Sequence, residues 1–108
     1  MQDGLYKVVF RTSLGTGGGV VVLREGRLCG GDSGLYFVGT YQVTGSHFTA
    51  DLQIDRHTQE PGARPLFGIS RLVVRLDGVG TGDEAVMRGT SPDAPGIEFE
   101  AVMTKLSD

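Results

Sequence analysis

Apolar and polar residues alternate with a period of two along much of the chain, a pattern typical of strands that bury one face. In the clearest run, from Phe48 to Asp55, every second residue is apolar and the residues between are Thr, Asp and Gln. No segment keeps a helical period over three turns. Eight strands are therefore expected, over residues 4–12, 19–23, 27–30, 35–43, 48–55, 67–77, 84–90 and 97–106.

Turn residues separate these segments. Glu25-Gly26 and Thr44-Gly45-Ser46 stand between neighbouring strand patterns and predict hairpin turns. Gly39 lies in the middle of a strand pattern, which indicates a bulge or a close approach of two backbones. Loops are expected where glycine or proline gathers, over residues 13–18, 58–65, 78–82 and 91–96.

Eight strands with one apolar face each must bury that face together. Closing the sheet into a small antiparallel, lipocalin-like barrel removes its edges, and eight strands enclose an interior that side chains fill or that holds one small ligand. A sandwich of two sheets fits the same pattern. Large apolar side chains on the expected inner faces either form the core or line an apolar ligand pocket: Tyr6, Phe10, Phe48, Leu52, Phe99 and Met103. Room for a pocket would come from inward Ala50, Ala85, Gly89 and Ala101.

Composition supports an all-β chain and excludes several classes of protein. Glycine accounts for 18 of 108 residues, and Val, Ile, Thr, Tyr and Phe together are about twice as numerous as Ala, Lys, Glu and Gln. A length of 108 residues predicts one domain, residues 1–108, and a single cysteine excludes a disulfide-rich module.

Charge and hydropathy point to a protein that binds neither nucleic acid directly nor membranes. Ten basic against thirteen acidic residues leave no basic footprint for nucleic acid. The longest apolar run, Val20–Leu23, is far shorter than the roughly 20 residues that span a bilayer. Met1–Gly4 has neither the basic nor the apolar region of a secretory signal, so we expect a cytoplasmic protein.

Two glycine-rich motifs suggest catalysis or phosphate binding at first sight. The segment from Cys29 to Gly34 resembles the C-x-G-D-S-G signature of chymotrypsin-like proteases, but His47 and His57 both follow Ser33, and the chain is about half the length that those enzymes need. A tight turn is the favoured interpretation. Gly15–Gly19 lacks the Lys-Ser/Thr of a phosphate-binding loop and predicts a hairpin loop instead. No catalytic residue is predicted.

Metal and cofactor binding are not predicted either. His47, Asp51, Asp55 and His57 share one parity along the fifth strand pattern, but a metal site needs three or four converging ligands, and a solvated outer stripe is the favoured interpretation. Cys29 is flanked by glycine and is interpreted as a small, half-buried apolar residue.

The chain resembles the GrlR-like family, lipocalin-like negative regulators of type III secretion. The resemblance rests on Gly4-Leu5-Tyr6 opening a strand that ends in Phe10, on Gly26, on Gly30-Gly31-Asp32, and on Gly39-Thr40-Tyr41 before a strand ending near Arg56. It implies a cytoplasmic barrel that is dimeric, performs no catalysis, and binds and silences a transcriptional activator.

One departure from the family concerns the contact with that activator. The acidic loop expected between the fourth and fifth strands corresponds here to Val43-Thr44-Gly45-Ser46, which contains no acid. The predicted function is therefore a non-catalytic regulatory or binding protein. The alternative is a carrier of a small apolar ligand without a protein partner.

Valines at positions expected to face outward predict self-association. They are Val9, Val21, Val73, Val86 and Val102. Closure of a barrel would bring Val9, Val86 and Val102 together, with Arg11, Arg88 and Glu100 as a polar rim. Exposed apolar patches commonly mark interfaces, so we expect a two-fold symmetric homodimer through this surface.

Overall fold

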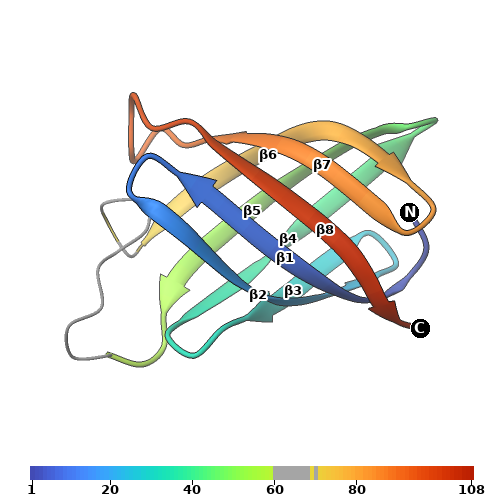
Figure 1. Ribbon diagram of the computed structural model, residues 1–108, viewed down its shortest axis with the longest axis horizontal. Coiled ribbons are helices and arrows are strands. Elements are labelled where there is room, and N and C mark those ends of the chain that lie inside the picture. Colours follow the sequence, from blue (N-terminus) through green and yellow to red (C-terminus); the bar gives the residue numbers. More distant parts are fainter. Residues whose placement is uncertain (60–68, 70) are drawn as a thin grey trace.

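The strands predicted from the alternating pattern form a sheet that closes into a ring. The computed structural model, which describes residues 1–59, 69 and 71–108, is a closed antiparallel barrel of eight strands in chain order (Figure 1). This confirms the barrel and excludes the sandwich. The strands are β1 (Gly4–Thr12), β2 (Gly15–Arg24), β3 (Arg27–Gly31), β4 (Leu35–Thr44), β5 (His47–Arg56), β6 (Leu72–Thr81), β7 (Glu84–Thr90) and β8 (Phe99–Ser107). None of the described residues belongs to a helix long and apolar enough to cross a membrane.

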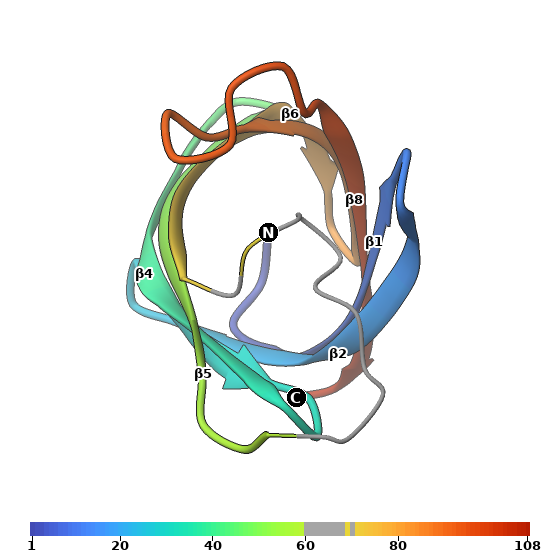
Figure 2. The same cartoon turned by 90° about the vertical axis from the view of Figure 1, so that its left-hand side faces the viewer.

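The first and last strands close the ring. β1 pairs with β8 from Leu5↔Ser107 to Arg11↔Glu100, with one shift of register between Leu5 and Tyr6. Figure 2 shows the ring end-on, with the N-terminus within its outline. Closure leaves no strand of the described sheet with an unpaired edge.

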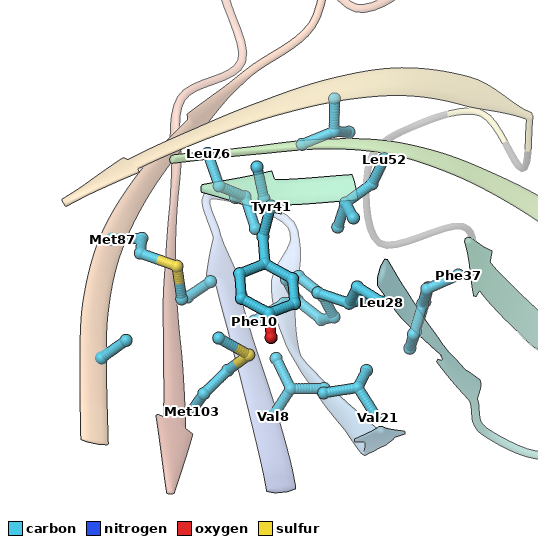
Figure 3. Close-up of a cluster of buried hydrophobic side chains, with 14 of the residues drawn as sticks. Val8, Phe10, Val21, Leu28, Phe37, Tyr41, Leu52, Leu76, Met87 and Met103 are labelled. Carbon is cyan, nitrogen blue, oxygen red and sulfur yellow. The ribbon is translucent and has the colours of Figure 1, made fainter. Parts of the chain in front are cut away.

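The inward faces form one hydrophobic core. The six large residues predicted to point inward are all at most 3% exposed, and all belong to the same cluster. Within it, the ring of Phe10 contacts Phe37 and Phe99 edge-on, at centroid distances of 5.3 and 6.0 Å. Figure 3 shows side chains from opposite walls meeting in the middle of the barrel.

Two glycine-rich segments that were predicted to be loops are strands. β2 begins at Gly15, and Gly15 to Gly18 pair with Thr12 to Val9 of β1. β6 continues through Gly78 and Gly80 to Thr81. Glycine shows no alternation because it has no side chain, but its backbone groups complete a ladder when a partner strand lies beside it.

Other differences are smaller. The sixth strand begins at Leu72 rather than at residue 67, which lies outside the described residues with most of the predicted loop 58–65. The eighth strand begins at Phe99 rather than at Ile97. Val21 was predicted to face outward but is 2% exposed, because the four apolar residues of 20–23 show no alternation that fixes their parity. Cys29, expected to be half-buried, is exposed.

Candidate binding surfaces

The inward-facing side chains of the described strands form one packed core. The residues predicted to form the core or to line a pocket belong to one packed cluster, in which the ring of Tyr41 stacks on that of Phe48 at 5.6 Å. Gly89, expected to leave room, faces the ring of Phe99, whose nearest carbon would lie 2.1 Å from a Cβ added at Gly89. These contacts support the interpretation of this set as core.

One end of the barrel is covered by the N-terminal segment. Met1 packs against the core. The hydroxyl of Tyr6 donates a hydrogen bond to the carbonyl oxygen of Gln2 at 2.6 Å, and the hydroxyl of Tyr41 lies 3.3 Å from the carboxylate of Asp3. Burial raises the pKa of both tyrosines, so both stay neutral and act as donors at neutral pH.

The protease-like segment is a tight turn, as predicted. The carboxylate of Asp32 accepts hydrogen bonds from the backbone N–H groups of Gly34 and Leu35, both at 2.8 Å. His57 reaches this turn, but its Nε2 donates to the carbonyl oxygen of Asp32 at 2.9 Å, and its Nδ1 lies 2.7 Å from the hydroxyl of Thr58. Both ring nitrogens are therefore engaged by groups other than Ser33.

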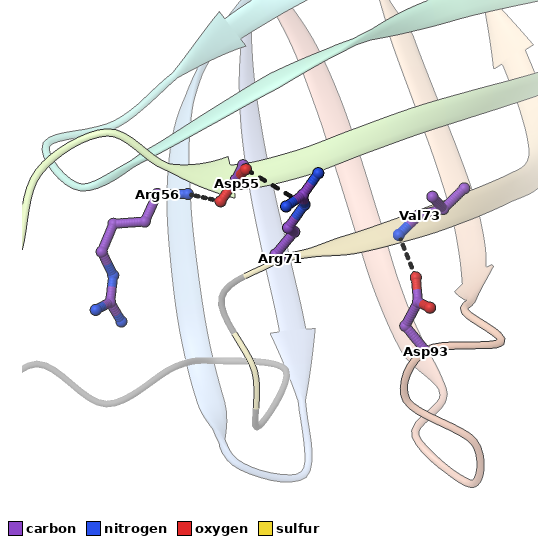
Figure 4. A network of polar contacts seen from close by, with 5 residues as sticks. All are labelled: Asp55, Arg56, Arg71, Val73 and Asp93. Carbon is purple, nitrogen blue, oxygen red and sulfur yellow. Dashed lines mark hydrogen bonds and ion pairs between the residues drawn. The ribbon is translucent and has the colours of Figure 1, made fainter.

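The outward stripe of β5 makes pairwise contacts with residues of β6 and with Arg71 just before it, rather than forming a cluster of ligands. His47 contacts Asp77 at 2.9 Å and Asp51 contacts Arg75 at 3.2 Å. Asp55 lies 3.7 Å from Arg71, as Figure 4 shows beside the bond from the N–H of Val73 to Asp93. Across residues 1–59, 69 and 71–108, no three His, Cys, Asp or Glu side chains gather as a metal site would require.

The residues that carry the family resemblance hold the backbone in place. A Cβ at Gly30 would lie 2.0 Å from the carbonyl oxygen of Val20, and one at Gly39 would lie 1.9 Å from that of Asp51. Register through Gly39 is regular on both sides, so it marks a close approach and not a bulge. A Cβ at Gly31 would lie 2.4 Å from the carbonyl oxygen of Leu35. With the Asp32 turn and the stacked ring of Tyr41, the motif has a structural role in this barrel.

The outer wall carries a surface that the sequence interpretation missed. We call it the β2–β4 face, and it consists of Val20, Val22, Cys29, Tyr36 and Val38. Its valines are between 39% and 45% exposed. A shallow groove along it is lined by Val22, Cys29 and Val38, with Arg24, Glu25 and Arg27 at one end. The signal was present in the apolar run 20–23, but the wrong parity for Val21 concealed it.

A second apolar surface lies across the barrel and contains the valines predicted to associate. Strand register places Val9 beside Val102, Val102 beside Val86, and Val86 beside Val79. We call these four residues the valine ladder. Val86 and Val79 are 51% and 57% exposed, and Val9 and Val102 are half-buried. Val79 was not among the predicted residues, because its strand was expected to end at Asp77.

Comparison of the chain with known proteins identifies no relative. No model of a known protein family matches the chain, and no curated protein matches its sequence significantly.

Proposed function

We propose that this protein is a non-catalytic binding protein that holds a partner protein on its β2–β4 face. The observation that carries the proposal is the contrast between a filled interior and an outer wall with exposed apolar side chains. A soluble barrel gains nothing by exposing these side chains to water, and contiguous apolar surface of this kind commonly marks an interaction site.

The chemistry of the face indicates the kind of partner it fits. Val22 and Val38 flank Cys29 in the strand register, and the groove between them ends at Arg24, Glu25 and Arg27, which together carry a net positive charge. Neither Arg24 nor Arg27 belongs to an ion pair in the described part of the chain. A segment with an apolar side chain for the groove and a carboxylate for the arginines matches this surface.

The resemblance to GrlR-like regulators supports a transcriptional activator as that partner, and with it a cytoplasmic role in controlling type III secretion. The hairpin Thr44-Gly45-Ser46 joins β4 and β5 without any carboxylate. An acidic hairpin is thus not available for the contact, and the proposal assigns it to the β2–β4 face.

A double variant and a single control variant test this. Val22→Lys with Val38→Lys places two charges in the groove, whereas Val73→Lys places one at a more exposed valine outside it. We expect a DNA-binding protein to be cross-linked in native cells by the wild type and by Val73→Lys, and the purified pair to bind in calorimetry. The double variant should weaken that affinity by roughly 100-fold, as expected for charges buried at an interface. Equal binding by all three forms would refute the proposal.

The alternative function, a carrier of a small apolar ligand, needs space that the side chains of the core now fill. Native mass spectrometry of the purified protein distinguishes the two functions. A stoichiometric small molecule retained by the folded protein and released on unfolding would favour the carrier and contradict the proposal.

A further inference from the structure

The valine ladder is bordered by a row of alternating charge. The next row of outward positions on one side of the ladder is charged. Strand register places Arg11 beside Glu100, Glu100 beside Arg88, and Arg88 beside Asp77. All four side chains are exposed. Across β1, β8, β7 and β6, the wall therefore presents a row of valines next to a row of charges that runs plus, minus, plus, minus.

This order of charges is complementary to itself. We infer that a second copy of this chain docks on the valine ladder, related to the first by a two-fold axis that runs parallel to the strands between β7 and β8. This rotation exchanges β8 with β7 and β1 with β6. It sets Val102 on Val86 of the second copy, and Val9 on Val79.

The same rotation matches every charge in the row. Arg11 meets Asp77 of the second copy, and Glu100 meets Arg88 of the second copy. Two-fold symmetry repeats each pair, so four opposite-charge contacts lie along one side of the valines. One two-fold rotation thus covers the exposed apolar area and pairs the opposite charges, as an interface between identical subunits requires.

A two-fold axis along the ladder, at right angles to the strands, does not give this match. It would lay each strand on its own copy and exchange the charged row with the row on the other side of the valines. Lys7, in that other row, would then meet Arg11 of the second copy as a like-charge pair, and Glu84 would meet Arg88 as an opposite-charge pair. This axis therefore sets repulsion against attraction, whereas the axis parallel to the strands makes all the charge contacts of the row attractive.

The size of the surface sets the strength expected. Four strands at a spacing of about 4.8 Å make a face only roughly 19 Å wide, and the wall curves away on both sides. The contact area should thus be below the roughly 800 Å² per partner of a standard interface. We therefore expect a reversible dimer whose population rises with concentration. The β2–β4 face lies on the opposite side of the ring, so this inference stands independently of the proposed function.

Charge reversal at two positions that are remote within one barrel tests the axis directly. Arg11 and Asp77 lie on β1 and β6, with β7 and β8 between them, so any coupling between them must act between copies. Arg11→Glu would oppose Asp77 of the second copy, and Asp77→Lys would oppose Arg11. We expect each variant alone to dimerise roughly tenfold more weakly in sedimentation equilibrium, since two attractive rim pairs become repulsive.

Mixing the two variants should restore association. In a heterodimer, Glu at position 11 meets Lys at position 77, and Arg at position 11 meets Asp at position 77, so both contacts are again between opposite charges. Native mass spectrometry with one variant isotopically labelled should show heterodimers in excess over both homodimers. A purely structural effect of either substitution would weaken the mixture as much as its components.

The apolar part of the interface has its own matched pair. Val86→Lys should abolish the dimer while leaving the circular dichroism spectrum unchanged, and Val73→Lys, at a similarly exposed valine, should leave the dimer intact. A wild type that remains monomeric up to about 1 mM, a weak limit even for transient interfaces, would overturn the inference. So would a dimer that resists Val86→Lys, or a mixture in which heterodimers are not enriched.

Discussion

At the scale of single residues, glycine sets how closely the strands of this barrel approach. A Cβ at Gly39 would lie 1.9 Å from the carbonyl oxygen of Asp51 and 2.9 Å from the Cα of Leu52. Those atoms belong to the backbone of β5, which cannot move aside without disturbing a ladder that runs the whole length of the strand. Glycine is required here by space rather than by an unusual φ angle.

We therefore predict that Gly39→Ala destabilises the protein by about 1–3 kcal/mol, the range typical of overpacking. Gly82 provides the matched control, because nothing lies within 4 Å of a Cβ added there. Gly82→Ala should change stability by less than about 0.5 kcal/mol. Urea unfolding of the three proteins measures both values, and equal midpoints for the two variants would show that the approach at Gly39 is not tight.

Whether a side chain faces the core or the solvent could be predicted from the sequence wherever apolar and polar residues alternate along a strand. Phe48 and Leu52 lie inside as their pattern indicated, since Asp51 and Gln53 on the alternate positions face water. Val21 could not be placed, because valine stands on both sides of it. Its parity is set by pairing with Tyr6 of β1 and Gly30 of β3, which is information from other parts of the chain.

At the scale of elements, the segment from Met1 to Asp3 ties together strands from separate parts of the barrel. Tyr6 of β1 and Tyr41 of β4 contact it through their hydroxyls, and the backbone N–H of Glu25 lies 3.4 Å from the Asp3 carboxylate. The amine of Lys105 in β8 donates to the side chain of Gln2 at 2.7 Å. A short segment with these contacts fixes one end of the barrel.

The two tyrosines make this end sensitive to alkaline pH. Burial raises the pKa of the Tyr6 hydroxyl in the folded protein above its value in the unfolded chain. The neutral form is thus favoured by folding, and its contribution to stability is complete below about pH 10 and lost as the pH rises further. We expect the thermal midpoint to fall above about pH 10.

Tyr6→Phe should make that fall shallower, because phenylalanine has no proton to lose. At neutral pH the same variant should cost about 0.5–1.5 kcal/mol, since the hydrogen bond to the Gln2 carbonyl is removed. Thermal unfolding of both proteins between pH 7 and the alkaline range measures the slope and the offset separately. An unchanged alkaline slope would mean that Tyr6 does not carry the effect.

Strand bounds could be predicted from the sequence where the side chains alternate between apolar and polar. β1 and β7 have the predicted bounds, Gly4–Thr12 and Glu84–Thr90. The first half of β2 and the end of β6 did not follow, because glycines there pair through the backbone alone. The missing Val79 of the valine ladder is a consequence of that error, since it lies between Gly78 and Gly80.

At the scale of the whole molecule, the barrel has two apolar outer surfaces on opposite sides of one core. The valine ladder was partly visible in the sequence because its members lie on strands with clear alternation, and the ring closes β1 against β8 as expected. The β2–β4 face emerged only when the register of three strands was known. Surfaces built across strands depend on pairing, which a one-dimensional pattern does not contain.

The closure between β1 and β8 also determines how the chain can be cut. Gly96 lies in the exposed loop before β8, with a φ of 85° and nothing within 4 Å of an added Cβ. The termini lie at the same end of the barrel (Figure 1), where Lys105 contacts both Gln2 and Asp108. A permuted chain that starts at residue 97, continues from Asp108 through a short Gly/Ser linker to Met1, and ends at Gly96 keeps every strand pair.

We predict that this permuted chain folds, with the β-rich circular dichroism spectrum of the parent and a loss of stability of about 2 kcal/mol or less, because only the local geometry of two surface loops changes. Deletion of residues 97–108 is the matched comparison. It removes Phe99, Ala101 and Met103 from the core and leaves β1 and β7 with unpaired edges, so the truncated chain should fail to unfold cooperatively and should aggregate. If the truncated chain unfolds cooperatively, or if the permuted chain does not, then closure by β8 is not what holds the barrel together.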